Sequence, residues 1–246
     1  MFTPHDRERV HKRVLEWSES DARVVAGAVV GSLAHRPGDR WSDLDLTFAV
    51  EDSVPIRDVL DQWSERLAQE FDAVQLFDLP SGGAIYRVFL LPGCLQFDLS
   101  FSPAAHFGAT GPNFRLLFGN AIEKPFIGPP SAHELFGYAI HHAVRARVSI
   151  ERARYWQAEY WISAVRDHAM SLACRRLGLP AYHGRGFDDL PPDVCRAFAG
   201  ALVRSPERVE LLRALHHAVD GLFRESSEVG ELAEKIEPWV RELISV

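Results

Sequence analysis

Hydrophobic and polar residues follow two different periods in the first half of the chain. Runs that are apolar, or that alternate every second residue, predict β-strands at 24–30, 43–50, 73–79, 84–91 and 94–101. Apolar residues spaced about 3.6 apart predict helices over 3–20 and 55–71. Thr3 is the expected N-cap of the first helix, and Asp52 or Ser53 that of the second.

This order of elements predicts the fold class of the first half. A helix, two strands, a second helix and further strands indicate an α+β arrangement, with a mixed sheet and helices on one face. Residues 114–118 fit either one more short strand or a helical turn. The segment Gly119 to Pro130 contains three prolines and two glycines and is typical of an interdomain connection. We therefore expect two domains, residues 1–128 and 129–246.

The second half of the chain has only helical periodicity. Ser131 and Glu134 have the spacing of a capping box at the start of the first of these helices. Further helical segments are expected over about 151–177, from 191, from 205 and over about 229–243. Four to five helices with short connections predict an antiparallel α-helical bundle.

A cluster of carboxylates follows the first predicted strand. That strand ends at Gly31 and Ser32, and after ten more residues come Asp43 and Asp45, which share one face of a strand. Asp98 lies on the polar face of another alternating strand, from which it could meet the pair across the sheet. Adjacent carboxylates repel unless a cation lies between them, and oxygen ligands of this kind suit Mg²⁺.

Together these residues resemble the signature of the DNA polymerase beta-like nucleotidyltransferase superfamily. The signature consists of an apolar strand, Gly-Ser, a spacer of about ten residues, an acidic-apolar-acidic strand and a later third acid. Members that modify small molecules often carry Arg-Gly shortly after Gly-Ser, where this chain has the residues 34–38, Ala-His-Arg-Pro-Gly. The contacts to phosphate are therefore expected to differ, and Arg36 and Arg40 are the arginines available in this loop.

The resemblance implies an enzyme that transfers a nucleoside monophosphate, AMP in the first instance, from an NTP to a hydroxyl of a small molecule, with release of pyrophosphate. Asp43, Asp45 and Asp98 would be catalytic and would hold two Mg²⁺ ions. Gly31, Ser32 and Arg40 would bind the triphosphate of the NTP, for which ATP is the expected co-substrate. Aminoglycoside- or lincosamide-type antibiotics are the acceptors that the resemblance suggests. A homodimer is compatible with this interpretation, although the sequence does not specify an oligomeric state.

In small-molecule nucleotidyltransferases of this type, a helical bundle follows the core and helps to bind the acceptor. The helical segment 155–170 carries polar residues on one face, of which Glu159, Arg166 and Asp167 are the candidate acceptor contacts. Tyrosines and tryptophans cluster at the start of the same segment and could bind a sugar-like or cationic molecule, although they could equally be core residues. The adjacent pair His141-His142 points in two directions on a helix and does not predict a zinc site.

Composition narrows the class of partner. The chain has 246 residues, is 47% hydrophobic and 25% charged, and carries a net charge of −7, which argues against binding to duplex nucleic acid. It shows no leader-like apolar segment and no apolar run of membrane-spanning length, and its three cysteines form no CxxC pair. These features favour a cytoplasmic protein with reduced thiols.

Two other interpretations stay open at this stage. An antitoxin-like nucleotidyltransferase would modify or bind a partner protein, but such minimal forms often lack a second domain. A protein that only binds nucleotide is disfavoured, because all three acidic residues of the signature are present.

Overall fold

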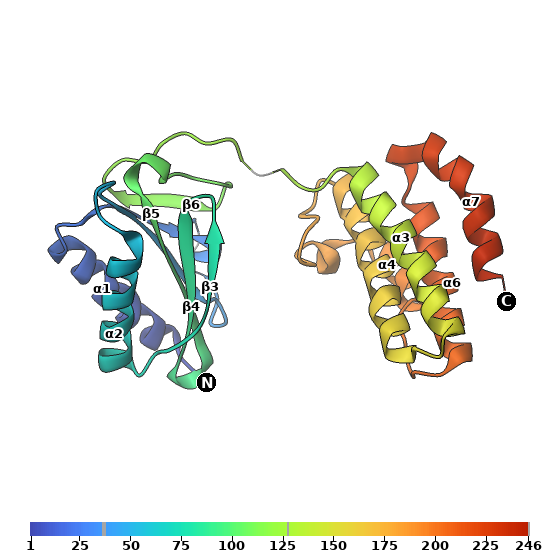
Figure 1. Cartoon of the computed structure of the whole chain (residues 1–246), viewed down its shortest axis with the longest axis horizontal. Helices are drawn as coiled ribbons and strands as arrows, with labels where there is room; N and C mark the ends of the chain where they lie inside the picture. The colour runs from blue at the N-terminus through green and yellow to red at the C-terminus, as the bar shows by residue number, and fades with distance from the viewer. Residues whose placement is uncertain (36–37, 127, 246) are drawn as a thin grey trace. The chain divides into compact units, whose positions relative to one another are not determined.

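The computed structural model describes residues 1–35, 38–126 and 128–245. The chain divides into two compact units, Met1–Ile127 and Gly128–Val246 (Figure 1). The first unit combines a mixed sheet with helices, and the second is helical, which confirms the α+β fold class and the helical bundle expected from the periodicity.

The N-terminal unit is built on one sheet of six strands in the described residues, with the order β3-β4-β5-β2-β1-β6. Strands β2 and β5 are parallel, and the other neighbouring strands are antiparallel. The main elements, in chain order, are α1 (Pro4–Ser20), β1 (Val24–Val30), the 3-10 turn η1 (Gly31–Leu33), β2 (Leu44–Val50), α2 (Ile56–Phe71), β3 (Val74–Ser81), β4 (Ala84–Leu91), β5 (Leu95–Pro103) and β6 (Phe114–Phe118).

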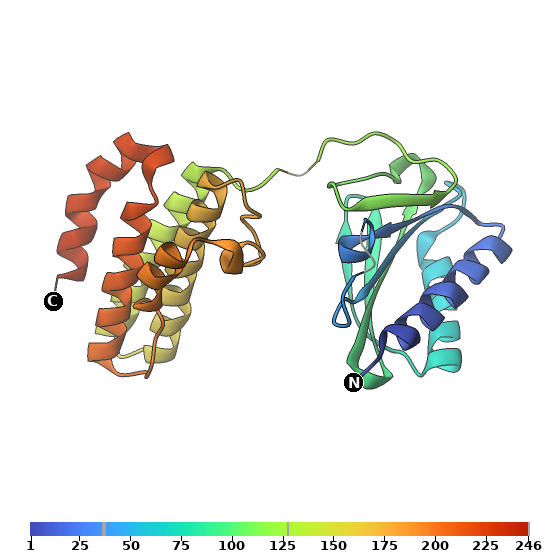
Figure 2. The ribbon, with the colours of Figure 1, turned by 180° about the vertical axis from the view of Figure 1, so that it is seen from behind.

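Helices α1 and α2 cover one face of this sheet, as Figure 2 shows from behind. Trp63 of α2 lies at the centre of the buried layer, with its ring 5.2 Å from Phe48 of β2, 5.1 Å from Phe101 of β5 and 5.9 Å from Trp17 of α1. Large aromatic side chains dominate the energy of such a core. The packing therefore joins both helices to the two central parallel strands.

Helix α1 begins with the expected side-chain cap, whereas helix α2 does not. Thr3 caps α1, and its hydroxyl accepts a hydrogen bond from the amide of Asp6 in a reciprocal capping box. Helix α2 instead begins after Pro55 without a side-chain cap, so the expected cap at Asp52 or Ser53 is wrong. The carboxylate of Asp52 accepts a hydrogen bond from the amide of Ala105 at 3.0 Å, and a side chain engaged there does not serve the helix.

The helical unit consists, in its described residues, of α3 (Ala132–Glu151), α4 (Tyr155–Arg176), α5 (Pro192–Ala199), α6 (Arg208–Arg224) and α7 (Gly230–Ile244). The predicted capping box at Ser131 and Glu134 is present at the start of α3. Small side chains such as Ala143, Ala146 and Ala158 are fully buried between the helices, which lets the helix backbones approach closely. Among the described helices, none is long and apolar enough to cross a membrane.

A buried ion pair links α2 to the sheet, and its contribution to the stability of the fold can be measured. Arg87 of β4, which is 4% exposed, donates to Asp78 of β3 at 2.7 and 2.8 Å and to Asp61 of α2 at 2.7 Å. Arg87→Met would leave the largely buried Asp78 carboxylate with only the exposed Arg57, 3.9 Å away, as a counter-ion, and we expect it to lower the free energy of unfolding by about 3 kcal/mol in urea titrations. The control is Asp61→Asn, whose carboxylate is 63% exposed and should cost less than about 1 kcal/mol. Equal losses in the two variants would contradict this assignment.

Candidate active site

Two of the predicted acidic residues face one another on the central parallel strands. Asp45 of β2 and Asp98 of β5 are directly paired in register. Their neighbours Leu44 and Leu46 point into the core beneath α1 and α2, so alternation places Asp45 on the opposite face of the sheet. The two carboxylates therefore lie side by side on the face that these helices leave uncovered.

Asp43 lies just before the start of β2 and adds its charge to the pair. Burial raises the pKa of the Asp98 carboxyl above its usual value, and the negative charge of Asp43 raises the pKa further. Gln96, two residues earlier on the same face of β5, donates a hydrogen bond to Asp98 Oδ1 at 2.9 Å and acts in the opposite direction. The three acidic residues thus share one region in which their ionised forms repel.

The turn after β1 brings main chain against this cluster. Gly31 has a φ of 67°, a conformation that favours glycine, and a Cβ placed there would lie 2.2 Å from Asp45 Oδ2. Only a residue without a side chain leaves the carboxylate in position. Ser32 follows in the same turn, and its side chain is exposed and open to a ligand.

Arg7 of α1 binds the main chain of the loop that leads into β2. Its guanidinium donates to the carbonyl oxygen of Asp39 at 2.8 Å and to that of Ser42 at 2.6 Å. Arg40 is exposed in this loop, with its guanidinium carbon 4.3 Å from the ring centre of Trp41. Arg36, the other arginine that the sequence offered for phosphate contact, lies outside the described residues.

The donor set of this region fits a hard divalent cation. Mg²⁺ prefers carboxylate oxygens, and a cation would offset the repulsion by Asp43 that adds to burial in raising the pKa of Asp98. As they stand, no three histidine, cysteine or acidic side chains of the described residues are arranged to enclose a metal ion. Mg²⁺ commonly uses only one or two protein carboxylates together with water and substrate phosphates, so the paired acids suit a shared rather than a closed site.

The candidate acceptor residues of α4 make local pairs. Glu159 accepts a hydrogen bond from Ser163 Oγ at 2.8 Å, and Arg166 donates to Asp167 at 2.8 Å. The structure does not join Glu159 to the other two by a hydrogen bond or ion pair. Of the aromatic side chains at the start of α4, Trp156 is 77% exposed.

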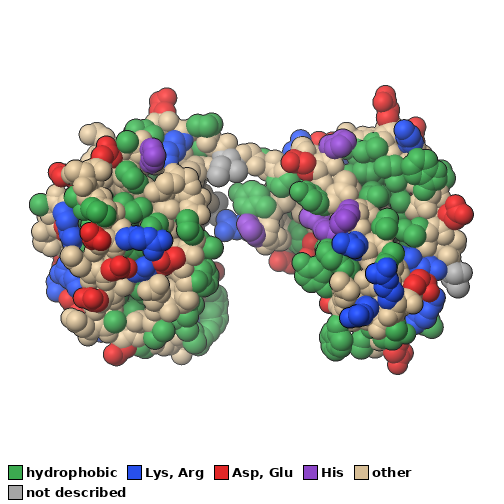
Figure 3. All heavy atoms as spheres, in the orientation of Figure 1, with side chains coloured by type: hydrophobic (Ala, Val, Ile, Leu, Met, Phe, Trp, Pro, Cys, Tyr) green, Lys and Arg blue, Asp and Glu red, His purple; other side chains and the backbone are tan. Residues whose placement is uncertain are grey.

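The sequence did not predict a cluster of histidine and aromatic rings that joins α3 and α4. The rings of His142 and His168 stack at 5.1 Å, and His142 also stacks on Trp161 at 5.0 Å. Figure 3 shows histidine side chains at the surface of the helical unit. Burial lowers the pKa of His142 to about 4, helped by His168 and His141. The adjacent pair His141-His142 was a signal, but its partner His168 is distant in sequence.

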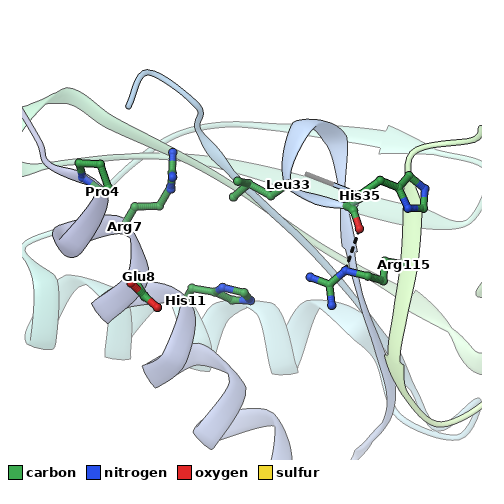
Figure 4. Close-up of a pocket in the computed structure, with 8 residues that line it drawn as sticks. Pro4, Arg7, Glu8, His11, Leu33, His35 and Arg115 are labelled. Carbon is green, nitrogen blue, oxygen red and sulfur yellow. Dashed lines mark hydrogen bonds between the residues drawn. The ribbon is translucent and has the colours of Figure 1, made fainter. Parts of the chain in front are cut away.

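The sequence also did not predict a cavity of about 650 Å³ at the β6 edge of the sheet. It is lined by residues of α1, η1 and β6, among them Arg7, His11 and Arg115 (Figure 4). A signal was available for Arg7, because it is in helical register with the buried residues Val10 and Val14 of α1. A charged residue within a buried stripe indicates a specific partner or role.

No protein-family model and no curated protein matches the sequence. Among solved structures, an aminoglycoside 6-adenyltransferase from Bacillus subtilis is similar over 100% of both chains, with a TM-score of 0.42 and 13% sequence identity. A similarity of this size does not identify the substrate of the present chain.

The raised pKa of Asp98 leads to a prediction about stability. A carboxyl whose pKa is higher in the folded than in the unfolded state stabilises the fold at low pH, and this contribution is lost as the pH rises through the folded pKa. Without divalent metal, Asp98→Asn should therefore be more stable than the wild type at pH 7, and this advantage should disappear below about pH 4. Thermal unfolding across this pH range measures it. Gln96→Ala, which removes a bond that favours the ionised form, should instead be less stable than the wild type at pH 7.

Proposed function

We propose that this protein is a Mg²⁺-dependent nucleotidyltransferase that moves a nucleoside monophosphate, AMP in the first instance, from an NTP to a hydroxyl of a small molecule. The observation that carries the proposal is the pairing of Asp45 with Asp98 on parallel strands, with the backbone of Gly31 packed against the Asp45 carboxylate. Asp43 completes the acidic set from the residue before β2. The pattern supports phosphoryl chemistry because acidic oxygens and a tight glycine turn lie together.

In this proposal Asp43, Asp45 and Asp98 hold two Mg²⁺ ions. When bound, these ions would neutralise charge on the triphosphate and favour the ionised form of the attacking hydroxyl. The exposed hydroxyl of Ser32 donates to a phosphate oxygen, and the main chain of Gly31 allows the triphosphate to approach closely. Arg40 supplies positive charge from the neighbouring loop.

In this proposal Asp98 also accepts the proton of the acceptor hydroxyl. Its Oδ1 accepts the hydrogen bond from Gln96, which orients the carboxylate. The acceptor oxygen then forms a bond to the α-phosphorus, the bond from that phosphorus to pyrophosphate breaks, and pyrophosphate leaves with the electron pair.

Acceptor recognition is assigned in this proposal to α4 of the helical unit. Asp167, half-exposed beside Arg166, and Glu159 offer carboxylates to hydroxyl or ammonium groups. The exposed ring of Trp156 offers a stacking surface for a sugar-like or cationic acceptor. The acceptor class is therefore a small polyhydroxylated or amino-substituted molecule.

The first test is nucleotide binding by calorimetry, with ATP and a slowly hydrolysed analogue titrated in Mg²⁺ and in EDTA. We expect binding that requires Mg²⁺ and that Asp45→Asn removes, because that variant lacks one carboxylate of the metal site. Binding of equal strength in EDTA, or in Asp45→Asn, would contradict the proposal.

A second test of the proposed function measures turnover as pyrophosphate release in a screen of small hydroxylated and amino-substituted acceptors. Asp43→Asn and Asp45→Asn should each lower the rate by roughly 100-fold or more, since each removes charge that stabilises the transition state. Thr47→Val is the matched control, because Thr47 lies two residues along β2 on the same face and carries no charge. A similar loss in Thr47→Val would show that the strand, and not the carboxylates, had been disturbed.

A further inference from the structure

The cavity between α1, η1 and β6 has the size of a small-molecule site and a basic lining. Its volume of about 650 Å³ lies within the range of known ligand pockets, which is roughly 300–1,000 Å³. Arg7 and Arg115 line it together with His11 and His35, and Glu8 is the acidic residue among its described lining. In Figure 4 the guanidinium of Arg115 and the ring of His11 point toward one another across this space.

Arg7 forms no ion pair with a described carboxylate, and the Asp39 carboxylate interacts with it only through the charge of Arg7, which helps to lower the pKa of the Asp39 carboxyl. Two arginines are buried among the described residues, Arg87 at 4% and Arg7 at 7% exposed. Arg87 is paired with two carboxylates, whereas the hydrogen bonds of Arg7 run only to two main-chain carbonyl oxygens. A buried charge without a directly bonded counter-ion is costly, so the contrast favours an anion beside Arg7.

Arg115 and His11 present further donors to the same space. Arg115 uses Nε to donate to the carbonyl oxygen of Ala34 at 2.7 Å and forms no ion pair with a described carboxylate. His11 Nε2 is buried and has no hydrogen-bond partner among the described residues. Burial lowers the pKa of His11, and the positive charge of Arg115 lowers it further. A bound anion would reverse that effect and supply the missing partner.

The cavity is separate from the acidic cluster. Arg115 of β6 is in register with Val29 of β1, whose side chain belongs to the core covered by α1 and α2. Asp45 and Asp98 lie on the opposite face, and neither they nor Asp43 belong to the cavity lining. The cavity and the candidate metal site therefore approach the turn after β1 from opposite sides of the sheet.

We infer that this cavity is a binding site for a phosphate-bearing anion. The Arg115 guanidinium and the His11 imidazole face one another from a strand and a helix, with Arg7 in the same lining, and this set of donors suits a tetrahedral phosphate with several acceptor oxygens better than a planar carboxylate. Because Arg7 also holds the carbonyl oxygens of Asp39 and Ser42, the bound anion fixes the loop that ends at Asp43. The inference does not depend on the proposed function, since it concerns different residues.

The test is an NMR titration of the histidine rings of the full chain in EDTA. Inorganic phosphate, pyrophosphate and ATP are added separately at constant ionic strength, and the His11 signal is assigned by its loss in His11→Gln. We expect a saturable shift of the His11 signal with at least one of these probes, together with a rise of the His11 pKa. Arg115→Gln should weaken the binding by about tenfold or more, because it removes a charged donor.

Two further variants and a competition between phosphate and ATP complete the titration experiment. Arg9→Met is the matched control, because Arg9 lies on α1 with its guanidinium 5.7 Å from the ring centre of Phe71, outside the cavity lining. Arg7→Lys tests Arg7 while keeping its charge, and its folding is checked by circular dichroism. Displacement of phosphate by ATP would identify the nucleotide as the source of the phosphate, and binding of phosphate that ATP does not displace would identify a free anion. No saturable His11 shift with any probe, or an unchanged affinity in Arg115→Gln, would overturn the inference.

Discussion

The parallel pairing of β2 with β5 is the contact on which the N-terminal unit depends. Parallel neighbours need a long crossover, and here it runs through α2, β3 and β4 before β5 returns beside β2. The crossover places Trp63 of α2 over Phe48 and Phe101, one from each parallel strand. The same register sets Asp45 opposite Asp98 on the other face. One pairing thus builds both the core and the acidic cluster.

The N-terminal unit contains three groups of charged side chains that differ in how completely they are paired. Arg87 and its two carboxylates form a complete ion-pair network that ties α2 to the sheet. Asp43, Asp45 and Asp98 are the acidic group, in which burial raises the pKa of Asp98 and the charge of Asp43 raises it further, so that a cation would be favoured beside them. Arg7 is the reverse case, a buried cation bonded to carbonyl oxygens beside a basic cavity. Incomplete charge pairing is costly for folding, and it is typical of positions that bind a ligand.

The helical unit shows how ring contacts arise from residues that are far apart in sequence. His142 of α3 stacks between His168 and Trp161 of α4, although its neighbour His141 is exposed. Burial keeps His142 neutral at physiological pH, so the stack behaves as an aromatic cluster and carries no positive charge there. Its polar members are thus part of the packing between the two helices.

Local chemistry explains why much of this protein could be predicted from its sequence. Periodicity predicted the strands and helices, and the capping boxes at Thr3 and Ser131 needed only residues three positions apart. The spacing of Gly31, Asp43 and Asp45 was also visible, because alternation along one strand decides which side chains share a face. The cap of α2 was mispredicted, since the contact of Asp52 with Ala105 joins residues that are distant in the chain.

Tertiary structure decided the features that need two or more distant segments. Only the register of β2 and β5 shows that Asp98 faces Asp45, and only the fold brings the main chain of Gly31 against that carboxylate. The cavity lined by Arg7, His11 and Arg115 exists because α1 packs beside the edge of the sheet, with residues more than a hundred positions apart. Sequence patterns report local backbone preference and burial, whereas convergence of charged groups depends on long-range packing, which periodicity does not encode.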